Sequence, residues 1–521
     1  MTMAVRHEPT DFSPKIAQAA AGGSIKPLLN AGLVLVDDQE ASRPQLAERV
    51  PQLNTESWLV LPDGRMETSY RLKPNLGWHD GAALTADDFV FAWQIYRHPG
   101  LGTFSPKPQD RIEEVAAPDP ATVLIRWTAI YPDAAILNQE DLTPLPRHLL
   151  AEGFAAFEAD ASRREQFLNQ PYWTSEFVGA GPYRFERWEP GATLELRAFE
   201  RYALGKPAID RIVVRFMSDE NSVLTSMLAG QVQLCYQYCL RFEHAQVLQR
   251  EWGPAQSGTV LLAPNAGTFV LVQFRPEYQK TSALLDPLVR RALVYGIDKQ
   301  ALLDGLFEGA GTVPYSHIPS DRAYYRALEP ALAKYAYDPR RSEQLMNEAG
   351  LTRDREGLFA DSVGLRFQPE FTALAGAASE RAQAIMADTW RRGGIETRPA
   401  ILPNAQVRDG QARHTFSGLG WSVGGGEEAF TSEQIGTPSN RWGGSNRGGW
   451  SNPEYDRLWG LYNTTLELTE RDRRLVRMAQ VVDEELPVFI LYFNYSVVAH
   501  IAAISGPKAR TLWNVQEWQL N

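Results

Sequence analysis

The stretch Tyr70-Arg-Leu-Lys-Pro-Asn-Leu-Gly-Trp-His-Asp-Gly-Ala-Ala-Leu-Thr-Ala-Asp-Asp-Phe-Val-Phe-Ala-Trp93 joins a strand-like segment, a glycine turn and a segment with helical periodicity. Thr85 stands where a helix N-cap residue is expected, and Asp88, three residues later, supplies the acidic half of a capping box. The stretch therefore predicts a strand, a turn and a capped helix from local rules alone. The large apolar side chains that share one face of this helix are Phe89, Trp93 and Tyr96.

The pair His79 and Asp80, just before the turn glycine Gly81, has a second interpretation as part of a metal-dependent phosphohydrolase. A protein metal site needs three or more convergent ligands, and none lie nearby in the sequence. We therefore interpret the pair as part of the turn and expect neither a metal nor a cofactor.

The composition is that of a large globular protein. The chain has 521 residues, of which 44% are hydrophobic, and this length corresponds to roughly two to four domains. The net charge of -11 argues against a nucleic-acid partner, because phosphate binding is driven by clustered Lys and Arg. The longest strongly apolar run, residues 488–493, is far shorter than the ~18 residues that a membrane helix needs.

The start of the chain and its cysteines bear on its cellular location. The opening Met-Thr-Met-Ala lacks the charged start and apolar segment of a secretion signal, so we expect the numbering to be that of a mature or trimmed chain. Cys235 and Cys239 are spaced C-x3-C, which permits either a short disulfide loop or two buried small side chains. A metal site is disfavoured, since no other Cys and no His closely accompanies the pair.

Beyond residue 178 the pattern predicts α/β architecture. Residues 193–199 and 209–216 have the features of strands, residues 222–228 those of a helix, and residues 232–234 those of a further strand. This order predicts a parallel βαβ unit. Helix N-caps are expected further along, at Asp286, Asp338 and Thr469.

Several segments together resemble the family 5 solute-binding proteins, the extracytoplasmic receptors that deliver peptides and sometimes other solutes to bacterial ABC importers. The quoted stretch resembles the signature of that family, and the likeness covers nearly the whole chain in the order that the family uses. The further segments that carry the resemblance are residues 179–183, 204–232, 286–298, 337–350 and 452–458.

The resemblance implies a type II periplasmic-binding-protein fold, with two lobes joined by a two-strand hinge and an extra inserted domain. Lobe I is expected to comprise residues 1–44, 178–262 and 487–521, the inserted domain residues 45–177, and lobe II residues 263–486. Such lobes close on a ligand by hinge bending, and closure is stabilised only by contacts that the open form lacks.

The resemblance also indicates where lobe II contacts the ligand. The family has a strand ending in Gly-Trp, matched here by Gly420 and Trp421, and peptide-binding members place an aspartate a few residues later for the peptide ammonium. Gly424 stands at that position instead. Glu427 or Glu428 could supply the missing carboxylate. Alternatively the glycines make room for a bulkier or uncharged ligand, and both glutamates are solvated.

Aromatic and basic residues near a glycine-rich loop are further candidates. Trp442 and Trp450 flank this loop and could stack on a sugar ring or cover an apolar side chain, unless they belong to the core. Arg441 and Arg447 could clamp a carboxylate or phosphate, with a surface salt bridge as the alternative. The candidates that the resemblance places in lobe I and the inserted domain are Gln18, Ala20, Ser24 and Phe104.

The sequence thus predicts an extracytoplasmic receptor of an ABC importer, at the periplasmic or extracellular face of the cytoplasmic membrane. Its expected ligand is a peptide or an amino-acid-derived compound, with an oligosaccharide or another solute as the alternative. Its expected partners are permease and ATPase subunits, and the protein is expected to be a monomer. A receptor that signals through a membrane partner is a third hypothesis.

An α/β hydrolase is the alternative from another functional class. It would need a nucleophile with a base, a metal triad or a cofactor loop. The chain has no G-x-S-x-G, H-E-x-x-H or G-x-G-x-x-G motif and no phosphate loop. We therefore predict that the protein is not an enzyme.

Overall fold

The computed structural model describes residues 1–15, 25–102, 107–236, 238–510 and 512–521. The chain forms two compact units, which we call unit 1 and unit 2.

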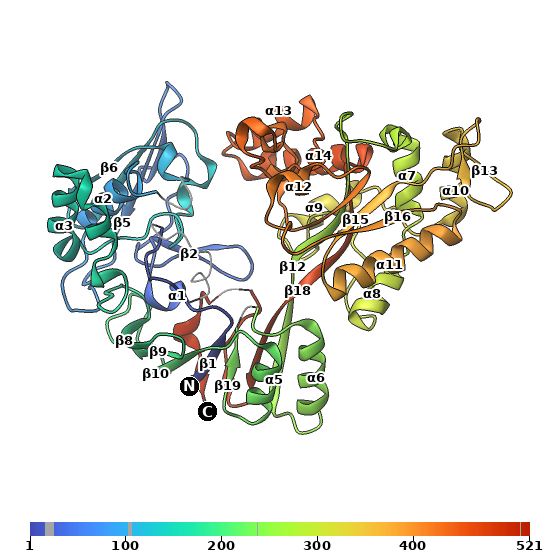
Figure 1. The fold of residues 1–521 in the computed structure, drawn as a ribbon. Helices are drawn as coiled ribbons and strands as arrows, with labels where there is room; N and C mark the ends of the chain where they lie inside the picture. Colours follow the sequence, from blue (N-terminus) through green and yellow to red (C-terminus); the bar gives the residue numbers. More distant parts are fainter. Residues whose placement is uncertain (16–24, 103–106, 237, 511) are drawn as a thin grey trace. The chain divides into compact units, whose positions relative to one another are not determined.

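Unit 1 consists of residues 1–263 and 496–521, and unit 2 consists of residues 264–495. The chain leaves unit 1 within strand β12 (Gly258–Val272) and returns to it within strand β18 (Val488–Ile501), as can be followed in Figure 1. These two strands are neighbours in one sheet. Unit 2 is therefore a single continuous stretch of sequence, whereas unit 1 is assembled from both ends of the chain.

The sheet of unit 1 has strand order β11-β1-β10-β9-β8. Strand β1 runs parallel to both of its neighbours, and β9 runs antiparallel to both of its own. Strand β10, helix α5 and strand β11 follow one another in the chain, which confirms the predicted parallel βαβ unit, with β1 lying between its two strands. The bounds are β1 Thr2–Val5, β8 Tyr183–Glu189, β9 Thr193–Ala198, β10 Arg211–Phe216, α5 Glu220–Leu228, β11 Leu234–Cys235 and α6 Phe242–Trp252.

A disulfide joins Cys235, in β11, to Cys239, with Cα atoms 6.2 Å apart. Both cysteines are fully buried and pack with apolar side chains of α5 and α6, among them Val223 and Leu248. Of the two interpretations that the sequence permits, the structure has the bridged form, and the bridge lies in the core.

A separate four-stranded antiparallel sheet lies between residues 58 and 127 of unit 1, in the order β4-β5-β7-β6. Side chains of strand β5 alternate in burial, with Met66, Thr68 and Tyr70 buried. Helix α2 packs on β6 and on helix α3. The bounds are β4 Trp58–Val60, β5 Met66–Arg71, α2 Ala86–Tyr96, β6 Ile112–Asp119, β7 Thr122–Trp127 and α3 Arg147–Ala159.

The predicted capping box is present at the start of α2. The backbone N–H of Thr85 donates to Asp88 Oδ2 at 2.9 Å, and the Thr85 side chain faces the N–H of Asp88. Asp88 also accepts from Trp78 Nε1 at 3.2 Å and from the N–H of Arg147 at 3.1 Å. One carboxylate thus ties the turn, α2 and α3 together. The predicted buried face is confirmed for Phe89, Trp93 and Tyr96.

His79 connects the turn to a glycine-rich segment far along the chain. Its Nδ1 accepts from the N–H of Gly179 at 3.2 Å, so the proton is on Nε2, which donates to the carbonyl of Gly181 at 3.0 Å. Burial lowers the pKa of His79 to about 4, and the ring is neutral at neutral pH. Asp80 bonds instead to His148 Nε2 at 2.7 Å and to the N–H of Ala82. Both side chains of the predicted turn therefore have structural partners within unit 1.

Unit 2 has strand order β16-β15-β17-β12, continued by β18. Strand β15 is parallel to β16 and β17, whereas β17 is antiparallel to β12. Helix α11 packs on β15 and β16, and also on α8. The bounds are α7 Pro287–Tyr295, α8 Lys299–Phe307, α9 Tyr325–Leu328, α10 Pro339–Glu348, β15 Glu370–Leu374, α11 Ala377–Arg392, β16 Arg398–Leu402, α12 Gly410–His414, β17 Leu419–Val423, α13 Pro453–Tyr462 and α14 Leu468–Glu485.

The helix caps of unit 2 agree with the sequence at two positions and differ at a third. Asp286 caps α7 by accepting from the N–H of Leu288 at 2.8 Å, and Asp338 caps α10. Helix α14, however, is capped by Glu467, whose carboxylate accepts from the N–H of Thr469. The prediction of Thr469 as the cap is wrong because the helix begins at Leu468.

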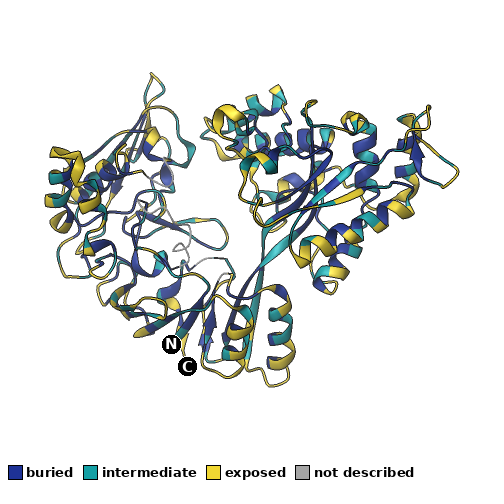
Figure 2. Cartoon of the chain, in the orientation of Figure 1, coloured by how far each residue is buried: buried dark blue, intermediate teal, exposed yellow. Residues whose placement is uncertain are grey.

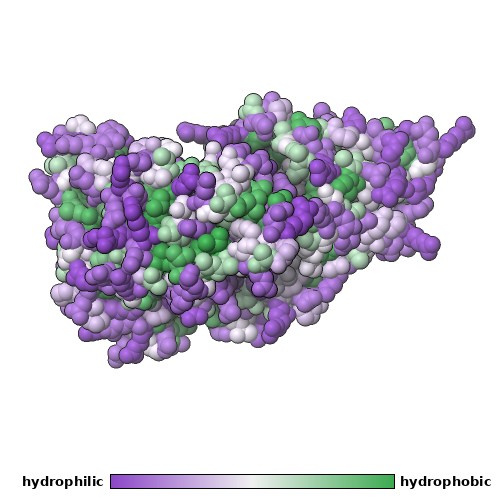
Figure 3. Space-filling view, turned by 90° about the horizontal axis from the view of Figure 1, so that it is seen from below, coloured by the Kyte–Doolittle hydropathy of each residue, from purple (hydrophilic) through white to green (hydrophobic). Residues whose placement is uncertain are grey.

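Short elements complete the chain, and in each unit the buried residues gather in the sheets and on the inner helix faces (Figure 2). Hydrophilic residues predominate in the view from below, with scattered hydrophobic patches (Figure 3). Among the described residues, no helix combines the length and apolar character needed to cross a membrane. The short elements are α1 Lys26–Leu29, β2 Val34–Val36, β3 Ser42–Pro44, α4 Arg164–Leu168, β13 Thr352–Arg353, β14 Phe359–Ala360, β19 Ile504–Ser505 and β20 Gln519–Leu520.

Candidate functional site

Strand β17 presents different chemistry on its two faces, because neighbouring side chains of a strand point to opposite sides. Trp421 is only 4% exposed and its ring lies 6.0 Å from that of Phe371, centroid to centroid. Its Nε1 is buried without a hydrogen-bond partner among the described residues. Ser422 points the other way, into a pocket. A Cβ at Gly420 would lie 3.0 Å from the ring of Phe416, so the glycine lets that ring pack on the strand.

The pocket beside Ser422 belongs entirely to unit 2 and has a cavity of about 30 Å³. Its polar side comprises Ser422, Asn446 and Arg447, and Gly424 and Gly425 leave one wall without side chains. Its apolar walls are formed by Phe269, Leu271, Phe430, Trp450 and Val488. Apolar walls with a few placed polar groups are a feature that this pocket shares with ligand sites, which are usually much larger.

The loop that carries Arg447 is held against the end of β12. The N–H of Phe274 donates to the carbonyl of Gly448 at 2.8 Å. A Cβ at Gly448 would lie 2.3 Å from the carbonyl oxygen of Val272, so only glycine permits this approach. The side-chain amide of Asn446 donates to the carbonyls of Thr431 and Trp450, at 3.0 and 2.7 Å, and closes the loop.

Arg275 anchors the same region through backbone carbonyls. Its guanidinium donates to the carbonyl of Gly436 at 2.9 Å, to that of Arg447 at 2.7 Å and to that of His414. Its Nε donates to Gln273 Oε1 at 3.1 Å. With its donors so engaged, Arg275 positions Arg447 and does not offer a binding group of its own.

The pocket is positively charged. Arg447 Nη1 donates to Ser422 Oγ at 2.7 Å, and burial together with the nearby charge of Arg413 lowers the pKa of Arg447 to about 10. Burial also lowers the pKa of His414, and the charges of Arg275, Arg447 and Arg413 lower it further. His414 is therefore neutral at neutral pH, and the positive charge resides on the arginines.

The two glutamates considered as carboxylate donors belong to the turn after β17. Glu427 Oε1 accepts from the hydroxyl of Tyr324 at 3.1 Å, and its carbonyl accepts from Tyr455 at 2.7 Å. Glu428 is exposed, and its Oε1 lies 3.4 Å from Gln434 Nε2. The described lining of the pocket contains neither carboxylate.

The remaining candidates of unit 2 lie in three different surroundings. Trp450 lines the pocket, is 2% exposed, and donates from Nε1 to Glu485 Oε2 at 2.7 Å. Trp442 is partly exposed and packs 6.3 Å from Tyr278, centroid to centroid. Arg441 is exposed. Of the positions considered in the sequence analysis, Trp450 and Gly424 both line the pocket. Trp421, Trp442 and Arg441 lie elsewhere in unit 2.

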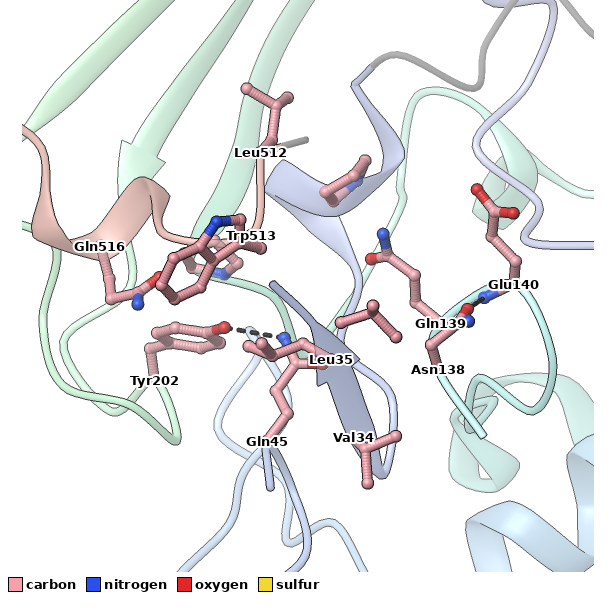
Figure 4. A pocket seen from close by; sticks show the side chains of 13 residues that line it. Val34, Leu35, Gln45, Asn138, Gln139, Glu140, Tyr202, Leu512, Trp513 and Gln516 are labelled. Carbon is pink, nitrogen blue, oxygen red and sulfur yellow. Dashed lines mark hydrogen bonds between the residues drawn. The ribbon is translucent and has the colours of Figure 1, made fainter. Parts of the chain in front are cut away.

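Unit 1 has a larger pocket, of about 220 Å³, which the sequence did not indicate (Figure 4). Gln45 and Tyr202 meet in its wall, where Gln45 Nε2 donates to the Tyr202 hydroxyl at 2.8 Å. Trp513 also lines this pocket. Residues so far apart in sequence leave no local pattern that could reveal their meeting. The predicted residues Gln18, Ala20, Ser24 and Phe104 lie outside the described residues.

The sequence analysis also missed Ser422, Asn446 and Arg413. Ser422 could have been found from strand alternation, since it must face away from Trp421. No local signal marks Asn446 or Arg413, because their importance comes from loop closure and from the proximity of Arg447.

The chain matches the family model described as bacterial extracellular solute-binding proteins, family 5 Middle, over residues 48–441. The oligopeptide-binding protein AppA of Bacillus subtilis (strain 168) is 22% identical over 527 residues, which cover 98% of this chain and 90% of AppA. Heme-binding protein A of Haemophilus influenzae is 26% identical over 451 residues, covering 82% of this chain and 76% of that protein.

Solved structures have the same fold. AppA from Bacillus subtilis in complex with a nonapeptide gives a TM-score of 0.70 at 19% identity, covering 100% of this chain and 98% of AppA. NikZ from Campylobacter jejuni in complex with Ni(L-His) gives 0.72 at 20% identity, covering 100% and 99%. The predicted type II periplasmic-binding-protein fold, a mixed α/β fold with a large central sheet, is confirmed.

Proposed function

The chain belongs to family 5 of the bacterial extracellular solute-binding proteins, and from this premise we propose that its ligand is a peptide or an amino-acid-derived compound. As a member of this family it is a solute-binding receptor of an ABC importer, located outside the cytoplasm, and not an enzyme. The proposal concerns the identity of the solute, the membrane partners and the working form of the receptor.

The observation that carries the proposal is the similarity to AppA over nearly the full length of both chains. AppA is named an oligopeptide-binding protein, and its structure holds a nonapeptide. Other relatives are described with heme or with Ni(L-His), so the fold alone does not select the solute. The small subsite with polar and apolar walls in unit 2 suits one end or one side chain of such a ligand.

In the proposed mechanism the protein captures its solute by hinge bending at β12 and β18, where the chain passes between the units. Ligand binding favours the closed form only through contacts that the open form lacks. Lobe I then comprises residues 1–44, 178–262 and 487–521, lobe II residues 263–486, and residues 45–177 are the inserted domain. The four-stranded sheet β4 to β7 lies inside that insert.

The receptor then delivers its solute to permease and ATPase subunits. We propose that it does so as a monomer, in the periplasm or at the outer face of the cytoplasmic membrane. A part in ligand binding for Trp421, Trp442, Trp450, Glu427 and Arg441 is included in the proposal. Mutation of each, scored by ligand affinity, decides its membership of the site.

Native mass spectrometry of freshly purified protein, combined with thermal-shift screening, tests the solute class. The screen compares short synthetic peptides, oligosaccharides and heme at matched concentrations. A peptide at about 100 times its dissociation constant should stabilise the protein by about 2.7 kcal/mol. A shift with oligosaccharides and none with peptides would replace the peptide proposal with the sugar alternative. Chemical turnover of a bound compound would contradict the role of a receptor.

A further inference from the structure

Helix α3, helix α4 and residues 170–178 border a groove of about 620 Å³ in unit 1, which we call the α3 groove. Of the described residues, none lines both this groove and either of the pockets described above. The proposed mechanism of solute capture does not use it. The charge and the apolar surface of the groove can therefore be considered apart from the solute.

Part of the inner surface of the α3 groove is apolar. Phe167 and Tyr172 line it and are themselves buried. Leu149, which also lines it, is 42% exposed, whereas Leu150 and Phe154 of the same helix are buried. Contact with a partner would remove the apolar surface of Leu149 from water, which is favourable. The groove can therefore hold an apolar side chain.

Gly153 lies inside helix α3, although glycine is a poor helix former. A Cβ at this position would meet the side-chain amide of Gln170, which lines the groove as well. The glycine therefore allows this side chain to lie against the helix backbone. A residue unfavourable to the helix is thus present where residues 170–178 approach α3.

Two carboxylates of the α3 groove, those of Glu152 and Glu176, are not neutralised. Both residues are exposed, and within the described parts of the chain neither has an ion pair or a side-chain hydrogen bond. Arg163, the basic residue of the described lining, is paired with Asp160, with Nε and Oδ2 3.8 Å apart. The groove therefore combines an apolar surface with free negative charge.

The acidic charge of the chain is concentrated in the same region. Residues 45–177, which include all of the described lining except Val178, contain 19 acidic and 11 basic side chains. The rest of the chain is almost balanced, with 44 acidic and 41 basic side chains. Within the groove Asp80 is engaged by His148, whose Nε2 lies 2.7 Å from its Oδ2. The charge around Glu152 and Glu176 thus favours a positively charged occupant.

We propose that the α3 groove is a docking site for a protein segment that presents an arginine or lysine beside an apolar side chain. The basic group pairs with Glu152 and Glu176, and the apolar side chain packs against Leu149 and Tyr172. The inference goes beyond the proposed solute-binding function and holds whichever solute the receptor carries.

A protein segment fits this groove better than a small free cation does. Glu152 and Glu176 are exposed, and an ion pair at an exposed carboxylate contributes little by itself. Stable binding therefore needs further contacts, which the apolar surface of the groove can supply to a side chain attached to the same partner. The complementary charge then speeds encounter and fixes which segment binds.

The first experiment uses three synthetic peptides that are acetylated and amidated at their ends, so that no terminal charge contributes. Each has the sequence Gly-Leu-X-Leu-Gly, where X is arginine, its uncharged analogue citrulline, or glutamate. Native mass spectrometry of the full chain at low ionic strength should show the arginine peptide bound about fivefold more tightly than the citrulline peptide, as expected for two exposed ion pairs. The glutamate peptide should bind least. Equal binding of the arginine and citrulline peptides would overturn the inference.

Variants of the two free carboxylates show whether they read the charge. The double variant Glu152→Gln with Glu176→Gln keeps the size of both side chains and should bind the arginine and citrulline peptides equally. Glu158→Gln is the matched control, because Glu158 is exposed on the same helix and is not part of the described lining. It should keep the wild-type preference. A preference that survives in the folded double variant would place the peptide elsewhere and contradict the inference.

Cross-linking locates the bound peptide. The two cysteines of the chain are joined in the buried disulfide, so a cysteine introduced at the groove is a single free thiol. Leu149→Cys should react with a peptide that carries an activated cysteine in place of one leucine, and faster for the arginine peptide than for the citrulline peptide. Ala155→Cys, exposed on the same helix outside the described lining, should react equally with both. Equal rates at Leu149→Cys would also contradict the inference.

Two other occupants give different results. If free arginine amide competes as well as the arginine peptide does, the groove takes a small cation and the docking proposal fails. If the full chain forms dimers that the double variant abolishes, the occupant is a second copy and the proposed partner is wrong. Either failure leaves the role of the protein as a receptor unaffected, since none of these experiments measures solute binding.

Discussion

His79 in unit 1 and Arg447 in unit 2 are both partly buried ionisable groups beside glycine-rich backbone, but their surroundings are opposite. Both ring nitrogens of His79 are hydrogen-bonded, one to Gly179 and the other to Gly181. Arg447 has one described acceptor, Ser422, for five N–H donors. One polar group is satisfied by the fold, whereas the other has most of its donors without an acceptor among the described residues.

The difference separates architecture from binding. A buried polar group whose hydrogen bonds are all made within the chain rigidifies the structure, and its loss destabilises the fold. A buried cation that lacks an anion destabilises the free protein and becomes favourable only when a ligand supplies the anion. Natural proteins commonly accept such a cost at binding sites. Four predictions test this contrast, beginning with the largest effect.

Trp421→Ala tests whether an unsatisfied polar atom makes a residue dispensable for the fold. Trp421 combines an unsatisfied Nε1 with deep apolar burial. We expect a loss of about 3 to 5 kcal/mol in the free energy of unfolding, since the cavity left by a buried tryptophan outweighs one missing hydrogen bond. Urea denaturation followed by circular dichroism measures it. Trp421→Phe, which keeps a ring against Phe371, should cost clearly less.

His79→Leu should destabilise unit 1 by about 3 kcal/mol, because it leaves the N–H of Gly179 and the carbonyl of Gly181 without partners. Denaturant unfolding of the variant against wild type gives the value. His7→Leu provides a control, since His7 is exposed and its replacement should have little effect. A variant as stable as wild type would show that water can replace both bonds.

The stability of wild-type unit 1 should fall as the pH falls from about 6.5 to about 4. His79 has a lowered pKa of about 4 in the folded chain, so in this window the unfolded chain binds a proton that the folded chain does not. Its contribution is complete above pH 6.5 and is lost on acidification, by up to about 3 kcal/mol. Unfolding midpoints measured across this range should show the slope. His79→Asn should flatten it, and an equally steep slope in that variant would point to other groups.

Arg447→Met should have the smallest effect and the opposite sign. In the absence of ligand we expect unit 2 to become more stable by about 1 kcal/mol, because a desolvated cation and its repulsion with Arg413 are removed. Calorimetry of the ligand-free protein measures the change. Arg126→Met is the comparison in unit 1, where Arg126 is paired with Glu67 at 2.9 Å, and it should not be stabilising. If Arg447→Met destabilises the ligand-free protein, Arg447 stabilises the fold.

Much of the fold could be predicted because its signals are local. The Thr85 and Asp88 capping box, the Asp286 cap and the strand over residues 193–199 each depend on residues a few positions apart. The cap of α14 was missed for an instructive reason. Threonine is the stronger N-cap type, but Glu467 lies two residues earlier and its carboxylate reaches the N–H groups of the first turn.

The candidate site was less predictable because its contacts join distant parts of the chain. The bond between Arg447 and Ser422 spans 25 residues, and that between Tyr324 and Glu427 spans 103. Glu427 was considered as a ligand group from its proximity to Gly424 in sequence. Its bond to Tyr324 could not be foreseen, since nothing in either segment marks the other as a neighbour. Resemblance pointed to strand β17, and the structure places Ser422, next to Trp421, at the pocket.

Because the chain passes between the units in β12 and β18, the two units are completed at different times during synthesis. Unit 2 is continuous in sequence and emerges complete before the last residues, whereas unit 1 waits for β18 to place His500 beside Leu234 and Ala499 beside Cys235. Because domains generally fold as units during synthesis, the second-made unit should finish first. A nascent chain stalled before residue 496 should therefore contain a protease-resistant unit 2 and an unfinished unit 1.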